Sequence, residues 1–235
     1  MMERFKKWFE NYWYHNKWPT LIVLLFVVVF AIGFGQIIGE KTNYDVYTLY
    51  AGATYLPKEA HDGVKTTLSE ISVKAAGDEG QKEKDVNLQM LIYLTEADVE
   101  EQKKAAEAAG QDYTFNYIEN RNVYDTFMKQ LVSGENVIMF LSPYLYETAE
   151  KNEALYSMKD ILGRTVPGLT SSGCGVRLSE SGLIEKYPGL KNLPEDTIVC
   201  LRRVTHAMKL IGKSESNESH MFQLDVAREM FKGIG

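Results

Sequence analysis

Residues 123–150 read VYDTFMKQLVSGENVIMFLSPYLYETAE and combine a helix, a strand and a second helix. Apolar residues recur at helical spacing over 123–132, and Gly134 ends that pattern. The run NVIMFL at 136–141 is almost wholly apolar, which is typical of a strand buried on both faces of a parallel sheet. Pro143 then favours the start of another helix. The stretch therefore predicts strands that alternate with helices.

The same alternation extends over the rest of the chain. Thr95 and Asp98 form a capping-box pattern that predicts the start of a helix there. Strands are predicted at 44–50, 86–94, 176–178 and 197–203, and further helices after Pro57, from 95 to 109 and from 217 to 232. We therefore expect an α/β fold with three layers, in which helices flank a mostly parallel sheet.

An apolar segment precedes this domain. Residues 21–34 contain no polar side chain, and four basic residues stand before them against two acidic ones. We predict a cytoplasmic or interfacial head at 1–18, a transmembrane signal-anchor helix at 19–39 and an extracytoplasmic domain at 40–235. A signal peptide removed near Gly33 or Gly35 and a buried core helix are the alternatives.

Composition and charge exclude several classes of protein. The 235 residues include 26 basic and 32 acidic ones, a formal charge of −6, with 45% hydrophobic residues. Four of the basic and two of the acidic residues precede residue 39, so the remainder carries a charge of −8. This balance argues against disorder and against a nucleic-acid partner.

Local motifs for catalysis or cofactor binding are absent. None of the four histidines has a second histidine four residues away, and the sequence contains neither Gly-x-Ser-x-Gly nor Gly-x-Gly-x-x-Gly. Residues 207–214 are too bulky for a phosphate loop, and the acidic loop at 78–85 fits a solvated turn better than a calcium site. We therefore expect no enzyme activity, no cofactor and no metal. Cys174 and Cys200 are either separate thiols or a disulfide.

The predicted sheet geometry nevertheless indicates a binding site. In open α/β sheets, ligands bind beyond the carboxyl ends of the strands, at a topological switch point. The residues expected there are Tyr50, Gly52, Thr54 and Tyr55 after the first strand, Ser142, Tyr144 and Tyr146 after the third, and Arg202 and Arg203 after the last. Tyrosines and arginines suit a small polar or anionic ligand, although the same residues also suit packing at the sheet rim and surface ion pairs.

The stretch from 124 to 144, with the opening strand and the closing run TIVCLRR, resembles the extracellular solute-binding proteins. This resemblance covers about 140 residues. No second lobe fits between the strands at 136–141 and 197–203, so the resemblance implies a single-lobe relative. The strings YDVYTLYAG, VIMFLSPYLYE and LPEDTIVCLRR are also similar to uncharacterised single-pass proteins of Gram-positive bacteria.

These patterns predict a membrane-tethered extracytoplasmic binding module for a small ligand or a protein. Its partners would be the lipid bilayer, through residues 19–39, and a small polar or anionic ligand or a membrane protein. The alternative is a non-catalytic accessory subunit or scaffold of a membrane complex. The sequence leaves the identity of the ligand, the partner and the oligomeric state open.

Overall fold

The computed structural model describes residues 2, 6, 12–14, 17–28, 44–77, 83–210, 212 and 214–234. The chain divides into two compact units, Met1–Asn43 and Tyr44–Gly235. In the first unit residues 17–28 are helical, with apolar side chains exposed. The predicted anchor at 19–39 lies partly outside the described residues. Within the part of the chain that is described, no helix combines the length and the apolar character needed to cross a bilayer.

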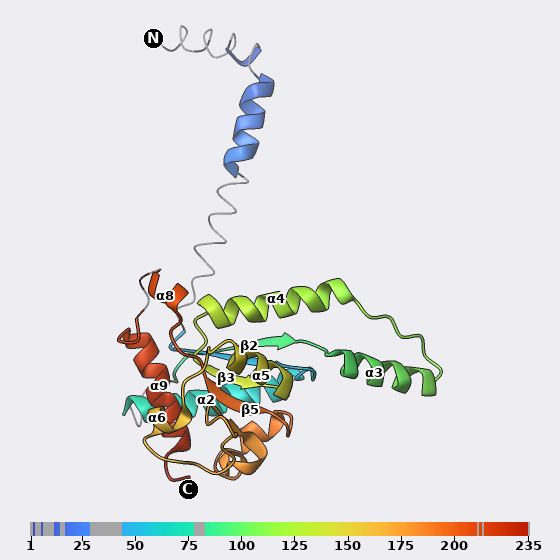
Figure 1. The fold of residues 1–235 in the computed structure, drawn as a ribbon. Coiled ribbons are helices and arrows are strands. Elements are labelled where there is room, and N and C mark those ends of the chain that lie inside the picture. The colour runs from blue at the N-terminus through green and yellow to red at the C-terminus, as the bar shows by residue number, and fades with distance from the viewer. Residues whose placement is uncertain are drawn as a thin grey trace. The chain divides into compact units, whose positions relative to one another are not determined.

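The second unit alternates strands and helices, as the sequence predicts (Figure 1). In chain order its elements are β1 (Val46–Gly52), α2 (Lys58–Ala76), β2 (Val86–Ile92), α3 (Glu96–Ala108), α4 (Tyr117–Ser133), β3 (Ile138–Leu141), α5 (Pro143–Lys151), α6 (Met158–Leu162), β4 (Gly175–Arg177), the 3-10 turn η1 (Leu178–Glu180), α7 (Leu183–Lys186), η2 (Pro188–Asn192), β5 (Ile198–Leu201), α8 (His206–Leu210) and α9 (Glu218–Phe231).

The five strands form one mixed sheet in the order β2-β1-β3-β5-β4. Strand β1 pairs in parallel with both β2 and β3. Strand β5 runs antiparallel to β3, with Ile138 opposite Leu201, and β4 is antiparallel to β5. The expectation of a mostly parallel sheet is therefore wrong at β5, which alone runs opposite to the other four strands and pairs antiparallel on both of its sides.

Helices cover both faces of the sheet, which gives three layers (Figure 1). Alternate residues of each strand point to opposite faces, so Tyr50 packs with α2 and α9, whereas Leu49 packs with α4 and α5. Val64, Leu68 and Ile71 of α2 are completely buried, as their helical spacing predicts. On the opposite face Phe127 of α4 is equally buried.

Capping residues set the helix boundaries. Thr95 and Asp98 form the predicted capping box at the start of α3. Helix α4 begins six residues earlier than the apolar periodicity predicts, because the Asn116 side chain accepts a hydrogen bond from the Glu119 N–H and caps a first turn that lacks a buried face.

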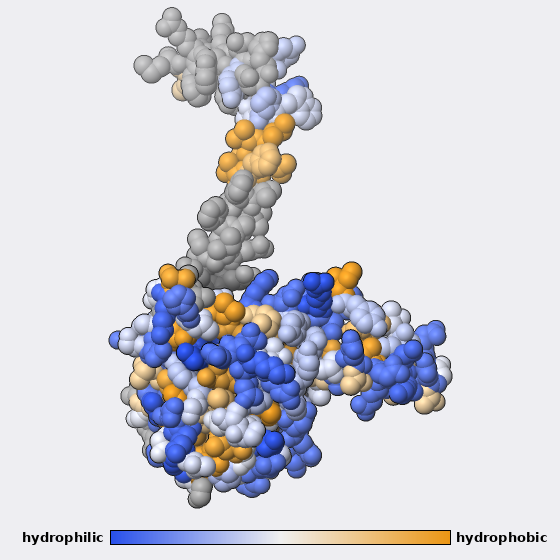
Figure 2. Space-filling model, in the orientation of Figure 1, coloured by the Kyte–Doolittle hydropathy of each residue, from blue (hydrophilic) through white to orange (hydrophobic). Residues whose placement is uncertain are grey.

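Helix α3 and the first half of α4 project beyond the sheet (Figure 1). No residue of α3 is buried, and Tyr117 and Ile118 at the start of α4 are 71% and 76% exposed. The surface of this arm is mainly hydrophilic, with an apolar patch near the beginning of α4 (Figure 2). Its base is fixed by Asn120, whose side chain accepts from the Leu94 N–H at 2.9 Å and donates to the Leu94 carbonyl at 2.8 Å.

Candidate functional site

The topological switch point of the sheet lies between β1 and β3. These strands are parallel neighbours, but the helices that follow them leave towards opposite faces: α2 packs in one core and α5 in the other. The two connections therefore diverge, and a crevice is expected between them at the carboxyl ends of the strands.

A cavity of about 210 Å³ lies at this point. Its lining residues come from four segments that are far apart in the sequence: Tyr50, Gly52, Ala53 and Thr54; Thr95 and Asp98; Ser142, Pro143 and Tyr144; and Pro194, Asp196 and Thr197. The volume lies below the ~300–1,000 Å³ of pockets for drug-sized ligands, so the cavity suits a smaller molecule. We refer to it as the switch-point pocket.

Of the nine residues that the sequence assigned to a ligand site, five line the switch-point pocket and four do not. Tyr50, Gly52, Thr54, Ser142 and Tyr144 are brought together. Tyr55 is 66% exposed and is not among the lining residues. Tyr144 is positioned by stacking on Tyr93, with ring centroids 5.7 Å apart.

Arg202 and Arg203 lie at the opposite edge of the sheet, because β5 is antiparallel and its carboxyl end meets the amino end of β3. Arg202 is 1% exposed, and its guanidinium donates to the carbonyls of Asn136 at 2.8 Å and Gly134 at 2.7 Å. Burial lowers the pKa of this guanidinium to about 10. Arg202 thus holds the turn before β3, and Arg203 is exposed beside it. The expectation that arginines close the ligand site is wrong in its geometry.

His220 lies at this same edge. It is 7% exposed, and its Nε2 is 3.1 Å from the Tyr156 hydroxyl. Burial is the main cause that lowers the pKa of His220, and the charge of nearby Arg202 acts in the same direction.

Hydroxyl groups dominate the inner wall of the switch-point pocket. Tyr50 is 1% exposed and donates to the Thr54 carbonyl at 2.9 Å, and burial raises its pKa to about 12. Ser142 is the N-cap of α5, but its side chain makes no capping hydrogen bond. Thr197 is 1% exposed, and no described residue bonds to its hydroxyl. Every fully buried side-chain polar atom among the described residues has a partner, so the Thr197 oxygen keeps some exposed surface, and the switch-point pocket is the cavity that Thr197 lines.

Two carboxylates supply the charge of the pocket. Asp98 Oδ2 accepts from the Thr95 N–H at 2.7 Å and hydroxyl at 2.6 Å, while its other oxygen bonds to no described residue. Asp196 is exposed, and no ion pair of its carboxylate occurs within the described part of the chain. No lysine, arginine or histidine is among the described lining residues. The pocket therefore lacks the arginine side chains on which the expectation of an anionic ligand rested.

Sequence reasoning missed the residues that precede β5 and the two residues of the capping box of α3, Thr95 and Asp98. Asp196 and Thr197 belong to the run LPEDTIVCLRR, which marks a strand but not its direction. Only the antiparallel pairing of β5 places its first residues beside Ser142. Asp98 was recognised for its capping role alone, and its free oxygen became evident only from the fold.

A second cavity of about 450 Å³ adjoins the first and shares Pro143 and Asp196 with it. The Tyr146 hydroxyl lies in its wall, 2.8 Å from Thr170 Oγ1 and 2.7 Å from Ser172 Oγ. Tyr146 thus belongs to this neighbouring cavity, where its hydroxyl is already engaged by protein groups.

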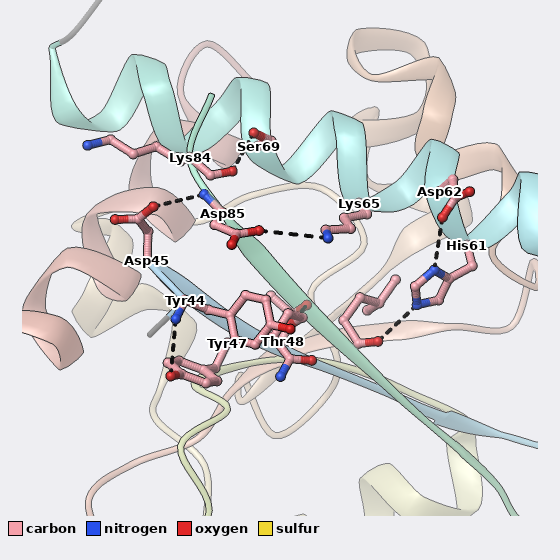
Figure 3. Close-up of polar contacts among 12 residues, drawn as sticks. Tyr44, Asp45, Tyr47, Thr48, His61, Asp62, Lys65, Ser69, Lys84 and Asp85 are labelled. Carbon is pink, nitrogen blue, oxygen red and sulfur yellow. Dashed lines mark hydrogen bonds and ion pairs between the residues drawn. The ribbon is translucent and has the colours of Figure 1, made fainter. Parts of the chain in front are cut away.

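A cavity of about 690 Å³ lies alongside α2, at the segment that precedes β2. Figure 3 shows polar contacts of several of its lining residues. Its polar groups bond to one another: Ser69 Oγ donates to the Lys84 carbonyl at 2.6 Å, and Lys65 Nζ is 3.8 Å from Asp85 Oδ1. Asp85 N–H also donates to Asp45 Oδ2 at 2.8 Å. The residues at 78–82, which include most of the acidic loop considered above, are outside the described part. Thr66, Glu70 and Lys74 of α2 line the same cavity, so its polar groups come from one helix and from the segment that precedes β2.

The described residues contain no group of three or more histidine, cysteine, aspartate or glutamate side chains that could hold a metal ion. Cys174 and Cys200 are both free thiols, half-buried and buried respectively, and burial raises the pKa of each. A thiol with a raised pKa is a weak nucleophile at neutral pH. Residues 211 and 213 of the stretch considered as a phosphate loop lie outside the described residues.

Searches with the whole chain found no matching protein-family model, no similar curated protein and no similar solved structure. The resemblance to single-lobe solute-binding proteins therefore remains a hypothesis that rests on the sequence strings alone. A proposal about function is therefore based on the chemistry of the pocket and not on similarity to other proteins.

Proposed function

We propose that residues 44–234 form a binding module for a small polar ligand, held by the switch-point pocket. The observation that carries this proposal is the convergence of four distant segments on one cavity that has unengaged hydroxyl and carboxylate oxygens. Most polar groups inside a protein bond to other protein groups, so a hydroxyl on a residue that is only 1% exposed, open to the pocket and without a protein partner, favours a role in ligand binding.

The same proposal includes a membrane tether at residues 19–39, with the N-terminus in the cytoplasm and the module outside. Its support is the apolar run at 21–34 and the basic excess before it. A protease added to intact cells tests this arrangement, because it would cleave the module but leave an N-terminal epitope tag protected. Protection of the module would contradict it.

Ligand binding is tested with the 235-residue chain in detergent micelles. We expect one class of small molecule from a panel of sugars, amino acids, amines and phosphates to raise the melting temperature in proportion to concentration. Gly52→Ala should abolish the response, because the added methyl would lie 3.0 Å from the Tyr50 hydroxyl oxygen and 3.5 Å from Ser142 Cβ. Tyr55→Ala, next to the pocket but outside its lining, is the matched control and should respond like the parent chain. Equal responses in both variants would contradict the proposed pocket.

The alternative of an accessory subunit is favoured by the projecting arm. Helix α3 buries no residue, and isolated helices of ~12–15 residues are marginal in water, so a partner that covers α3 would stabilise it. A photo-crosslinker at position 118 tests this idea, with the full chain inserted in its membrane. A specific protein adduct supports the accessory subunit, whereas an adduct with lipid alone, or no adduct, contradicts it.

A further inference from the structure

The first turn of α5 faces the switch-point pocket without a cap. Ser142 is its N-cap and Pro143 its first residue, and the Ser142 hydroxyl leaves the first turn unbonded. The backbone N–H groups of Tyr144 and Leu145 donate to no atom among the described residues, although Leu145 is completely buried. The first N–H groups of a helix have no intrahelical acceptor and carry a partial positive charge, so this end attracts an oxyanion.

The pocket also has a negative side. Asp196 and Asp98 both line it, one oxygen of Asp98 bonds to no described residue, and no described cation compensates either carboxylate there. Within about 210 Å³ the chain therefore presents a helix N-terminus and two carboxylates. A simple anion would meet the aspartates, and a simple cation would meet the uncapped helix.

Thr197 supplies an independent indication that a ligand completes this cavity. The residue is 1% exposed, its hydroxyl bonds to no described residue, and the pocket is the space onto which that oxygen opens. Because no described residue bonds to this hydroxyl, a polar molecule in the pocket would supply its hydrogen-bond partner.

We propose that the switch-point pocket binds a small zwitterion of amino-acid type, with its carboxylate at the first turn of α5 and its ammonium group beside Asp196. The N–H groups of Tyr144 and Leu145 and the Ser142 hydroxyl donate to the ligand carboxylate. Asp196 and Asp98 accept hydrogen bonds from the ammonium group. The Thr197 hydroxyl either donates to the ligand carboxylate or accepts from the ammonium group, depending on which lies nearer. The inference deepens the proposed function and rests on it.

The test compares alanine with two probes that each keep one of its charges, propionate and ethylamine. Isothermal titration of the 235-residue chain in detergent micelles gives the three affinities. We expect alanine to bind at least tenfold more tightly than either probe. Equal affinities would overturn the zwitterion and leave the proposed pocket intact. If none of the three binds while another class from the panel shows binding sensitive to Gly52→Ala, the zwitterion alone is wrong. If nothing binds, both proposals fail.

Two variants locate the charges. Asp196→Asn should weaken alanine at least tenfold and leave propionate unchanged, whereas Glu195→Gln, its exposed neighbour in the adjoining cavity, should change neither. Ser142→Asp places a carboxylate where the ligand carboxylate would bind. It should abolish the binding of alanine without lowering the melting temperature, because aspartate is a good N-cap. Retained alanine binding in either Asp196→Asn or Ser142→Asp would overturn the assignment.

Discussion

Replacing Arg202 by methionine should destabilise the module without affecting its pocket. Arg202 is buried, and its guanidinium donates to the carbonyls of Asn136 and Gly134. Methionine keeps most of the apolar stem but removes both donors, so two carbonyls of the turn before β3 lose their charged partner.

The magnitude follows from those two hydrogen bonds. Each charge-assisted bond contributes about 1.5–3 kcal/mol, so removing the pair costs about 3–6 kcal/mol. Releasing a buried charge recovers part of its desolvation cost, which leaves about 3 kcal/mol of net destabilisation. For a unit of this size the melting temperature then falls by about 6–12 °C.

Urea unfolding followed by far-UV circular dichroism measures this difference. Tryptophan fluorescence would not serve, because the three tryptophans all precede residue 19 and lie outside the α/β unit. Arg203→Met is the matched control, since Arg203 is exposed, and it should stay within about 0.5 kcal/mol of the parent chain. A loss below 1 kcal/mol in Arg202→Met, or equal losses in both variants, would refute the structural role of Arg202.

Three further outcomes are expected. Asn120→Ala removes both hydrogen bonds to the Leu94 backbone, so it should cost about 1–3 kcal/mol and speed amide hydrogen exchange across 95–126, and an unchanged exchange pattern would contradict the clamp. The folded chain keeps His220 neutral where the unfolded chain, with a histidine pKa of about 6.5, binds a proton, so stability falls as the pH decreases through that value. His220→Gln should therefore lose less stability than the parent between pH 7.5 and 5.5, and equal losses would count against a lowered pKa. Iodoacetamide should label Cys174 alone in the native chain and also Cys200 in denaturant, as mass spectrometry would reveal, whereas a disulfide would block both.

The order of strands and helices was predictable because each element carries its own periodicity. Val64, Leu68 and Ile71 mark the buried face of α2, and NVIMFL marks β3, whatever their partners. Capping chemistry is local too, which is why Thr95 and Asp98 were recognised from sequence. The start of α4 was missed because its first turns face solvent and leave no apolar pattern.

Two of the four segments that line the pocket could be predicted by the same logic. The residues after β1 and β3 share an edge in any parallel pair, so Tyr50 and Ser142 were placed together correctly. The direction of β5 depends on partners that are distant in the chain. Its apolar pattern would be the same for a parallel and for an antiparallel strand. Because the sequence indicated a parallel β5, it placed Arg202 at the carboxyl edge of β3, where the structure has Thr197.

The late arrival of β5 has a consequence during synthesis on the ribosome. Strand β3 is an inner strand of the finished sheet, paired on both sides by β1 and β5. Until residues 198–201 have been made, the β3 run IMFL presents an apolar edge with unpaired backbone groups, the kind of surface that recruits other strands. The nascent chain therefore passes through an aggregation-prone stage, which ends when β5 pairs with β3.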